Sequence, residues 1–157
     1  MRRITLLVVM AICAAASAFA QGSTGSTTTT IQFSFPPTGL ALTETAQINV
    51  TNIAAASSTG TAASCTGSVS FVNSSGATIG TATSFTVGTG QIASVSLPFA
   101  KAAVSGSRTE IRGVVQHTVT RPSTVPCSLV FSLEVYDTST GATHLLLGNS
   151  QAGSERL

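Results

Sequence analysis

Residues 127–147 read CSLVFSLEVYDTSTGATHLLL. Apolar side chains occupy every second position from Cys127 to Val135, which is the pattern of a β-strand with one buried face. Residues 137–141 combine Asp, Ser, Thr and Gly, the residue types that turns favour. Because residues 143–147 alternate again, this stretch predicts a β-hairpin.

The same alternation recurs along the chain before this hairpin. Turn-forming residues separate the alternating segments, and one short helical turn is expected around residues 101–104. Gly113, inside the longest alternating segment, predicts a β-bulge. The strands expected before the hairpin cover residues 31–35, 46–51, 65–71, 79–87, 93–97 and 109–119.

Seven or eight strands with closely spaced turns predict an all-β fold, an immunoglobulin-like antiparallel β-sandwich with one disulfide. A jelly roll would produce much the same pattern. The chain has no Trp, whereas immunoglobulin domains carry a core Trp beside their disulfide. We expect the sandwich to cover residues 31–148, after a flexible Gly/Ser/Thr arm at 21–30 and before a loose C-terminal tail at 149–157.

The first twenty residues have the order of a secretory signal peptide: a basic start, an apolar stretch and small residues at its end. Cleavage is expected between Ala20 and Gln21. A membrane anchor is the competing interpretation, but no basic residues follow the stretch. A lipid on Cys13 is not expected, because this residue lies inside the apolar run. No second apolar stretch of spanning length follows, so no stable membrane insertion is expected after cleavage.

Charge excludes two classes of partner. Once the leader with its two arginines is removed, five basic residues face five acidic ones. A near-neutral chain lacks the basic surplus of a nucleic-acid-binding or polybasic membrane-surface protein. About a third of the residues after the leader are Ser or Thr, so hydroxyl groups supply the polarity.

Two cysteines remain after the leader, Cys65 and Cys127. An even pair in an exported protein predicts a disulfide. A zinc site and a catalytic thiol are the alternatives. Neither a CxxC spacing nor a nearby His supports zinc, and an oxidising compartment favours pairing over a free thiol.

No catalytic, cofactor-binding or metal-ligating residue is predicted, and no cofactor is expected. Residues 88–93 match the letters of a dinucleotide-binding loop, but a strand follows them instead of the required helix. His117 and His144 are expected to be ordinary strand side chains. Glu110 and Glu134 are expected to form cross-strand ion pairs with Arg108 or Arg112 rather than a glycosidase pair.

A Ser/His/Asp set could be assembled on paper from Asp137, His144 and one of the many serines. The abundance of serine removes any weight from such a match. The sequons at Asn49 and Asn73 are likewise expected by chance in a chain this rich in Ser and Thr.

Several segments together resemble small exported bacterial proteins with a single immunoglobulin-like domain and no assigned activity. They are residues 39–52, the Gly90-Gln91 turn before residues 94–97, and the Asp-x-x-x-Gly loop at 137–141. The resemblance implies the β-sandwich fold and export, and it implies no chemistry.

These observations predict a non-catalytic exported β-sandwich of the cell envelope or extracellular space that acts by binding or assembly. The alternative is a carbohydrate-binding or adhesin-type module, including pilin-like strand exchange. The expected partner is an unidentified protein or glycan, and self-association is possible. The flexible arm joined to residues 31–35 suggests a strand that pairs with a neighbour, although the same residues also suit the first strand of the protein's own sheet.

Overall fold

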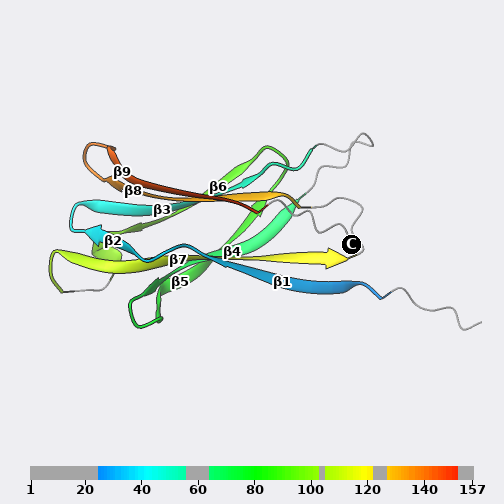
Figure 1. Cartoon of the computed structure of the whole chain (residues 1–157), viewed down its shortest axis with the longest axis horizontal. Helices are drawn as coiled ribbons and strands as arrows, with labels where there is room; N and C mark the ends of the chain where they lie inside the picture. Colours follow the sequence, from blue (N-terminus) through cyan, green and yellow to red (C-terminus); the bar gives the residue numbers. More distant parts are fainter. Residues whose placement is uncertain (1–24, 56–63, 103–104, 122–126, 152–157) are drawn as a thin grey trace, which may run out of the picture.

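The computed structural model describes residues 25–55, 64–102, 105–121 and 127–151 (Figure 1). Nine β-strands and one short 3₁₀ turn make up this part of the chain. They are β1 (Thr27–Ser34), β2 (Thr38–Ala41), β3 (Glu44–Asn52), β4 (Cys65–Asn73), β5 (Thr78–Val87), β6 (Ile92–Pro98), η1 (Phe99–Lys101), β7 (Arg108–Arg121), β8 (Leu129–Asp137) and β9 (Thr143–Gln151).

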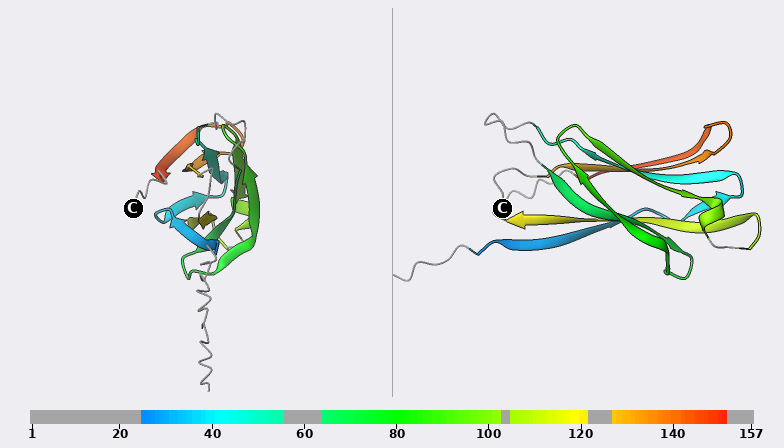
Figure 2. Two further views of the ribbon diagram at one scale, coloured as in Figure 1. Left: turned by 90° about the vertical axis from the view of Figure 1, so that its right-hand side faces the viewer. Right: turned by 180° about the vertical axis from the view of Figure 1, so that it is seen from behind.

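The strands form two antiparallel sheets, which confirms the β-sandwich (Figures 1 and 2). Sheet A has the order β1-β7-β4-β5, with β2 paired to β7 as well. Sheet B has the order β6-β3-β8-β9. Figure 2 shows the layered arrangement from one end and from behind.

The described residues form nine strands, one more than the seven or eight expected. The additional strand is β2, which pairs with one end of β7 while β1 pairs with the other. Pro36 and Pro37 separate β1 from β2, because proline has no N–H for the ladder. A turn at Leu42 and Thr43 then carries the chain from β2 in sheet A to β3 in sheet B.

Five of the strands are arranged as in an immunoglobulin domain. Strands β3 and β6 pair in sheet B, and β5, β4 and β7 are neighbours in sheet A. These are the places of strands B and E and of strands C′, C and F. The outer places differ, because β1 from the start of the chain occupies the place of strand G beside β7. Strand β8 occupies the place of strand A beside β3.

The core lies between the sheets and comes from the alternating positions. In β8 the burial alternates at every residue from Leu129 to Val135, and Phe131 and Leu133 are fully buried. Ile48 and Val50 from β3 are fully buried as well. Burial of these side chains supplies the main driving force for the fold.

Two segment boundaries differ from the expected ones. Strand β1 begins at Thr27, so residues 27–30 of the expected arm belong to the sheet. Strand β9 reaches Gln151, so residues 149–151 of the expected tail belong to the sheet. Both extensions consist of polar residues that gain a ladder partner, which alternation of apolar residues does not reveal. Residues 21–24 of the arm and 152–157 of the tail lie outside the described residues.

The predicted bulge at Gly113 is wrong. The β4–β7 register runs without a shift through the pair Phe71↔Gly113. Register irregularities lie instead in the β4–β5 pair, between Val69 and Phe71, and in the β8–β9 pair, between Val135 and Tyr136. A Cβ atom on Gly113 would lie 2.5 Å from Cδ1 of Ile48 in the opposite sheet, so the glycine serves close packing.

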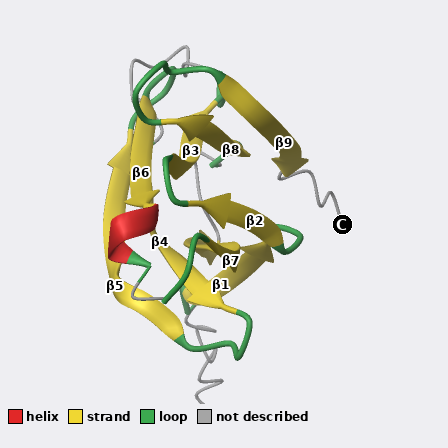
Figure 3. Ribbon diagram, turned by 90° about the vertical axis from the view of Figure 1, so that its left-hand side faces the viewer, coloured by secondary structure: helices red, strands yellow, loops and turns green. Residues whose placement is uncertain are grey.

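A short helical turn is present at Phe99–Lys101, immediately after β6, slightly earlier than expected (red in Figure 3). Phe99 is buried and forms part of the core. Residues 103–104 lie outside the described part. The leader, including the Ala20–Gln21 cleavage position, also lies outside it.

Candidate functional site

The Cys65–Cys127 disulfide is present, as predicted. Its Cα atoms are 5.6 Å apart, within the range that an ordinary disulfide spans. Cys65 is the first residue of β4 in sheet A, and Cys127 lies two residues before β8 in sheet B. The bond therefore joins the two sheets at one end of the sandwich.

Strand β1 forms an exposed edge of sheet A (blue in Figure 1, beside β7). Its sequence is TTTTIQFS, and seven of its eight residues are exposed. It pairs with β7 from Thr27↔Arg121 to Ser34↔Val114. Residues 31–34 therefore belong to the first strand of the chain's own sheet, which is one of the two interpretations given above.

Phe33 is the apolar anchor of β1. Its ring stacks on Phe131 of β8, with the ring centroids 5.7 Å apart and the planes at 22°. It also meets Phe35 edge to face at 4.9 Å. Phe35 is buried, and its N–H donates to the carbonyl oxygen of Gly113 at 2.9 Å. The inner end of β1 is therefore attached to the core, whereas the rest depends on its ladder with β7.

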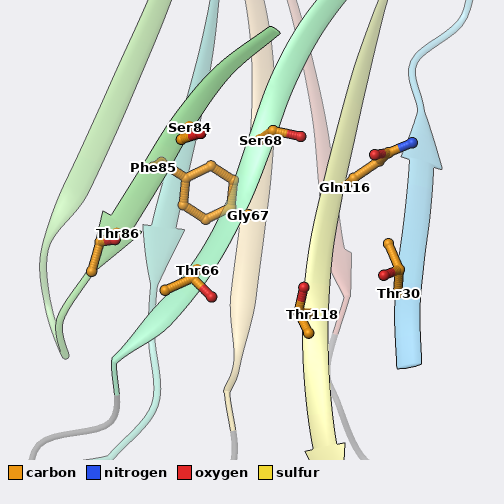
Figure 4. A pocket seen from close by; sticks show the side chains of 9 residues that line it. All are labelled: Thr30, Thr66, Gly67, Ser68, Ser84, Phe85, Thr86, Gln116 and Thr118. Carbon is orange, nitrogen blue, oxygen red and sulfur yellow. The ribbon is translucent and has the colours of Figure 1, made fainter. Parts of the chain in front are cut away.

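Part of the outer face of sheet A is lined by uncharged polar side chains. Outward-facing residues pair across strands, as Thr30 does with Thr118 and Thr66 with Thr86. A shallow depression of about 400 Å³ crosses these pairs (Figure 4). Its side chains come from β1, β7, β4 and β5, which Figure 4 shows side by side: Thr30, Thr66, Ser68, Ser84, Phe85, Thr86, Gln116 and Thr118, around Gly67.

The outer face of sheet B carries a hydrogen-bonded polar network. The Gln47 amide nitrogen donates to Glu134 at 2.9 Å, and Asn49 donates to the same oxygen at 3.3 Å. Ser94 donates to Asn49 at 2.6 Å, and Ser96 donates to Gln47 at 2.9 Å. These contacts bridge β6, β3 and β8, so side chains satisfy one another across three strands.

The ion pairs expected for the two glutamates with Arg108 or Arg112 are absent from the described residues. Glu134 lies in sheet B, whereas both arginines lie in β7 of sheet A. Glu110 belongs to β7 itself and faces Gly39 of β2, which offers no side chain. Strand parity alone could not reveal that the glutamate and the arginines belong to different sheets.

His144 pairs with Glu44. Its Nδ1 lies 2.7 Å from Oε1 of Glu44, and Oε2 of the same carboxylate accepts a hydrogen bond from the Ala41 N–H at 2.7 Å. The hydrogen bond from His144 is the main cause that lowers the pKa of Glu44. The pair ties β9 to the turn between β2 and β3. Sequence reasoning missed it because the two residues lie 100 positions apart.

The Ser/His/Asp set considered above does not form among the described residues. Asp137 accepts hydrogen bonds from Ser139 and Thr140 within its own turn. These bonds, first that of the Ser139 hydroxyl, lower the pKa of Asp137 well below its usual range. His144 contacts a carboxylate instead of a hydroxyl. The Asp137 loop therefore has a structural role in the β8–β9 hairpin.

His117 is buried in β7 with 8% of its surface exposed, and its Nδ1 has no hydrogen-bond partner. Its ring lies 6.2 Å from that of Phe131. Burial lowers the pKa of His117, because the charged form loses its hydration. His117 is therefore a buried side chain of β7 that packs beside Phe131.

In the described ranges, no three His, Cys, Asp or Glu side chains gather in a way that could hold a metal ion. None of the helical structure described in the chain is long and apolar enough to cross a membrane. Comparisons with protein-family models, with curated proteins and with solved structures gave no match.

Proposed function

We propose that the protein is exported and acts in the cell envelope or the extracellular space as a non-catalytic β-sandwich, by binding or by assembly. The observation that carries this proposal is the edge of sheet A. Strand β1 is exposed at seven of its eight residues and carries no charge or proline. An uncharged edge offers its free N–H and C=O groups to another strand.

Export is supported by two features. A disulfide such as the one between Cys65 and Cys127 is typical of proteins in an oxidising compartment. The leader pattern ends in small residues at Ala20. Mass spectrometry of the exported protein should find Gln21 at its N-terminus. An intact leader, or a lipid on Cys13, would contradict this part of the proposal.

Assembly is tested by light scattering of the mature protein over a wide concentration range. We expect larger species that increase with concentration, since a near-neutral chain does not repel its copies. Ile31→Lys places a charge on the β1 edge and should return the protein to monomers. The matched control is Ile92→Lys, on the exposed edge strand of sheet B, which should leave association unchanged.

Circular dichroism must show that both lysine variants are folded. Monomers at every concentration, together with no binding to isolated envelope fractions, would refute the proposal. If Ile92→Lys abolishes association and Ile31→Lys does not, the interface lies on sheet B.

A carbohydrate-binding or adhesin-type module is the second candidate, and the hydroxyl-lined depression of Figure 4 favours it. Hydroxyl and amide groups that converge on one site can fix the orientation of a polar ligand. A glycan array tests this candidate. Thr86→Val, in the depression, should weaken any binding, while Thr81→Val, exposed on the same strand outside it, should not.

A further inference from the structure

We infer that β1 is an exchangeable strand, and that residues Thr27–Ser34 of one copy pair with β7 of a second copy. This inference rests on the proposed function and names the partner as another molecule of the same chain. In the exchanged form, β1 would keep the register that it has with its own β7. Strand β2 would stay on the other end of its own β7.

The first argument is the way β1 is tethered. Its ladder partner lies far along the chain, as the pair Ile31↔His117 shows, so no hairpin joins the two strands. Only the segment Phe35-Pro36-Pro37 connects β1 to the rest of its own sheet. Continuing the β1 register would bring Thr38 opposite Glu110, but Thr38 faces Ile111. The proline segment is therefore a joint at which the register changes by one residue.

The second argument is what holds β1 in place. Seven of its residues are exposed, so apolar burial is concentrated at Phe33, which stacks on Phe131. The other contacts are the backbone ladder, the edge-to-face contact with Phe35 beside the joint, and outward side-chain pairs such as the 2.8 Å hydrogen bond from Gln116 to Gln32. A second copy supplies the ladder, the Phe131 contact and the outward pairs unchanged. The exchanged form therefore differs from the monomer in the conformation of the joint and in the entropy of association, while the interface between β1 and β7 is the same.

The third argument is what the edge of β7 needs from the strand that pairs with it. Without β1, the N–H and C=O groups on one side of residues 114–121 of β7 would lose their partners. The ring of Phe131 would lose the ring of Phe33, which stacks on it. The free edge therefore needs a strand with an aromatic side chain at the position of Phe33. The same chain carries such a strand, and a lysine that would discourage pairing is missing from it.

The test uses single cysteines at an outward-facing pair. Gln32→Cys is made in one chain and Gln116→Cys in another chain of different tagged mass. The two are unfolded in denaturant without reductant, mixed, refolded together at several concentrations and then mildly oxidised. Pairing of β1 of one chain with β7 of the other brings the two cysteines together, so exchange favours a disulfide between the chains. We expect this mixed dimer to exceed the control several-fold and to increase with concentration.

The control pairs Gln32→Cys with Thr86→Cys, because Thr86 is exposed on the same face but on β5, at the other edge of the sheet. A chain with both Gln32→Cys and Gln116→Cys should close its own disulfide at high dilution, which verifies the register. Failure of that closure in a folded chain would overturn the inference, because the β1 contacts would then be wrong.

A mixed dimer no more abundant than in the control, at every concentration, would also overturn strand exchange. If larger species nevertheless appear in light scattering, assembly occurs through another surface and the proposed function stands. If no larger species appear and no binding is found, both proposals fail.

Discussion

Replacing Gly113 with Ala should destabilise the sandwich through one contact between the sheets. The new Cβ would lie 2.5 Å from Cδ1 and 3.3 Å from Cγ1 of Ile48, and 3.1 Å from Cδ2 of Phe35. Ile48 is fully buried, so its side chain has packed neighbours on every side. Overpacking of a core costs about 1–3 kcal/mol. The lower entropy of the unfolded chain after a Gly→Ala change returns about 0.4–1 kcal/mol.

The 2.5 Å approach places the cost in the upper half of that range, so the net loss for Gly113→Ala should be about 1–2.5 kcal/mol. Ile48→Val removes Cδ1 and costs about 0.5–1.5 kcal/mol by itself. The double variant lacks the closest clash. Its loss of stability should therefore be smaller than the sum of the two single losses, by at least about 0.5 kcal/mol. Urea unfolding followed by circular dichroism measures all four proteins of this cycle.

Gly148→Ala is the matched control, because Gly148 lies in β9 and a Cβ there would meet nothing within 4 Å. This variant should be as stable as the parent protein or slightly more stable. The reasoning is refuted if Gly113→Ala behaves like the control. Strict additivity with Ile48→Val would show that the Cδ1 contact is not the cause of the loss.

Three further outcomes are expected. Cys65→Ala should lower stability by about 2–5 kcal/mol, since the bond to Cys127 closes a loop of 62 residues; quantitative alkylation of both thiols without reductant would disprove the bond. The pKa of His117 is lowered in the folded state, so the unfolded chain takes up its proton first as the pH falls below about 6.5. Stability should therefore decrease from pH 7 toward pH 5, and His117→Phe should remove most of that decrease; an unchanged pH dependence would exclude this residue as the cause. The carboxyl of Asp137 should stay ionised through pH 3 in an NMR titration, because its turn donates several hydrogen bonds to it; titration at its ordinary pKa would mean that these bonds do not form in solution.

Much of the fold follows from local patterns. Alternation from Cys127 to Val135 predicted the strand that holds the most buried aromatic residue, and the Asp137 loop predicted its hairpin. Both cysteines lie on the apolar parity of the alternating segments in the sequence, and their pairing is confirmed. These predictions succeed because a half-buried strand has a side-chain period of two, which depends on neighbouring residues alone.

The positions that sequence reasoning placed wrongly depend on contacts between distant residues. Gly113 carries no local sign that Ile48 approaches it from the opposite sheet. Glu134 finds amide donors in β3 because sheet order places it away from the arginines of β7. The partner of His144 is likewise determined by which turn lies beside β9.

The sequence by itself determined the class of fold, the disulfide and the near-neutral, hydroxyl-rich composition, because periodicity, cysteine count and composition are properties of the chain. Tertiary structure alone decided that β1 lies beside β7, in the place that a hairpin strand fills in an immunoglobulin domain. It also decided that Phe33 meets Phe131 and that the proline joint changes the register. The physical reason is that strand order and register are set by long-range pairing and by the closure of one shared core, which residues close in sequence do not encode.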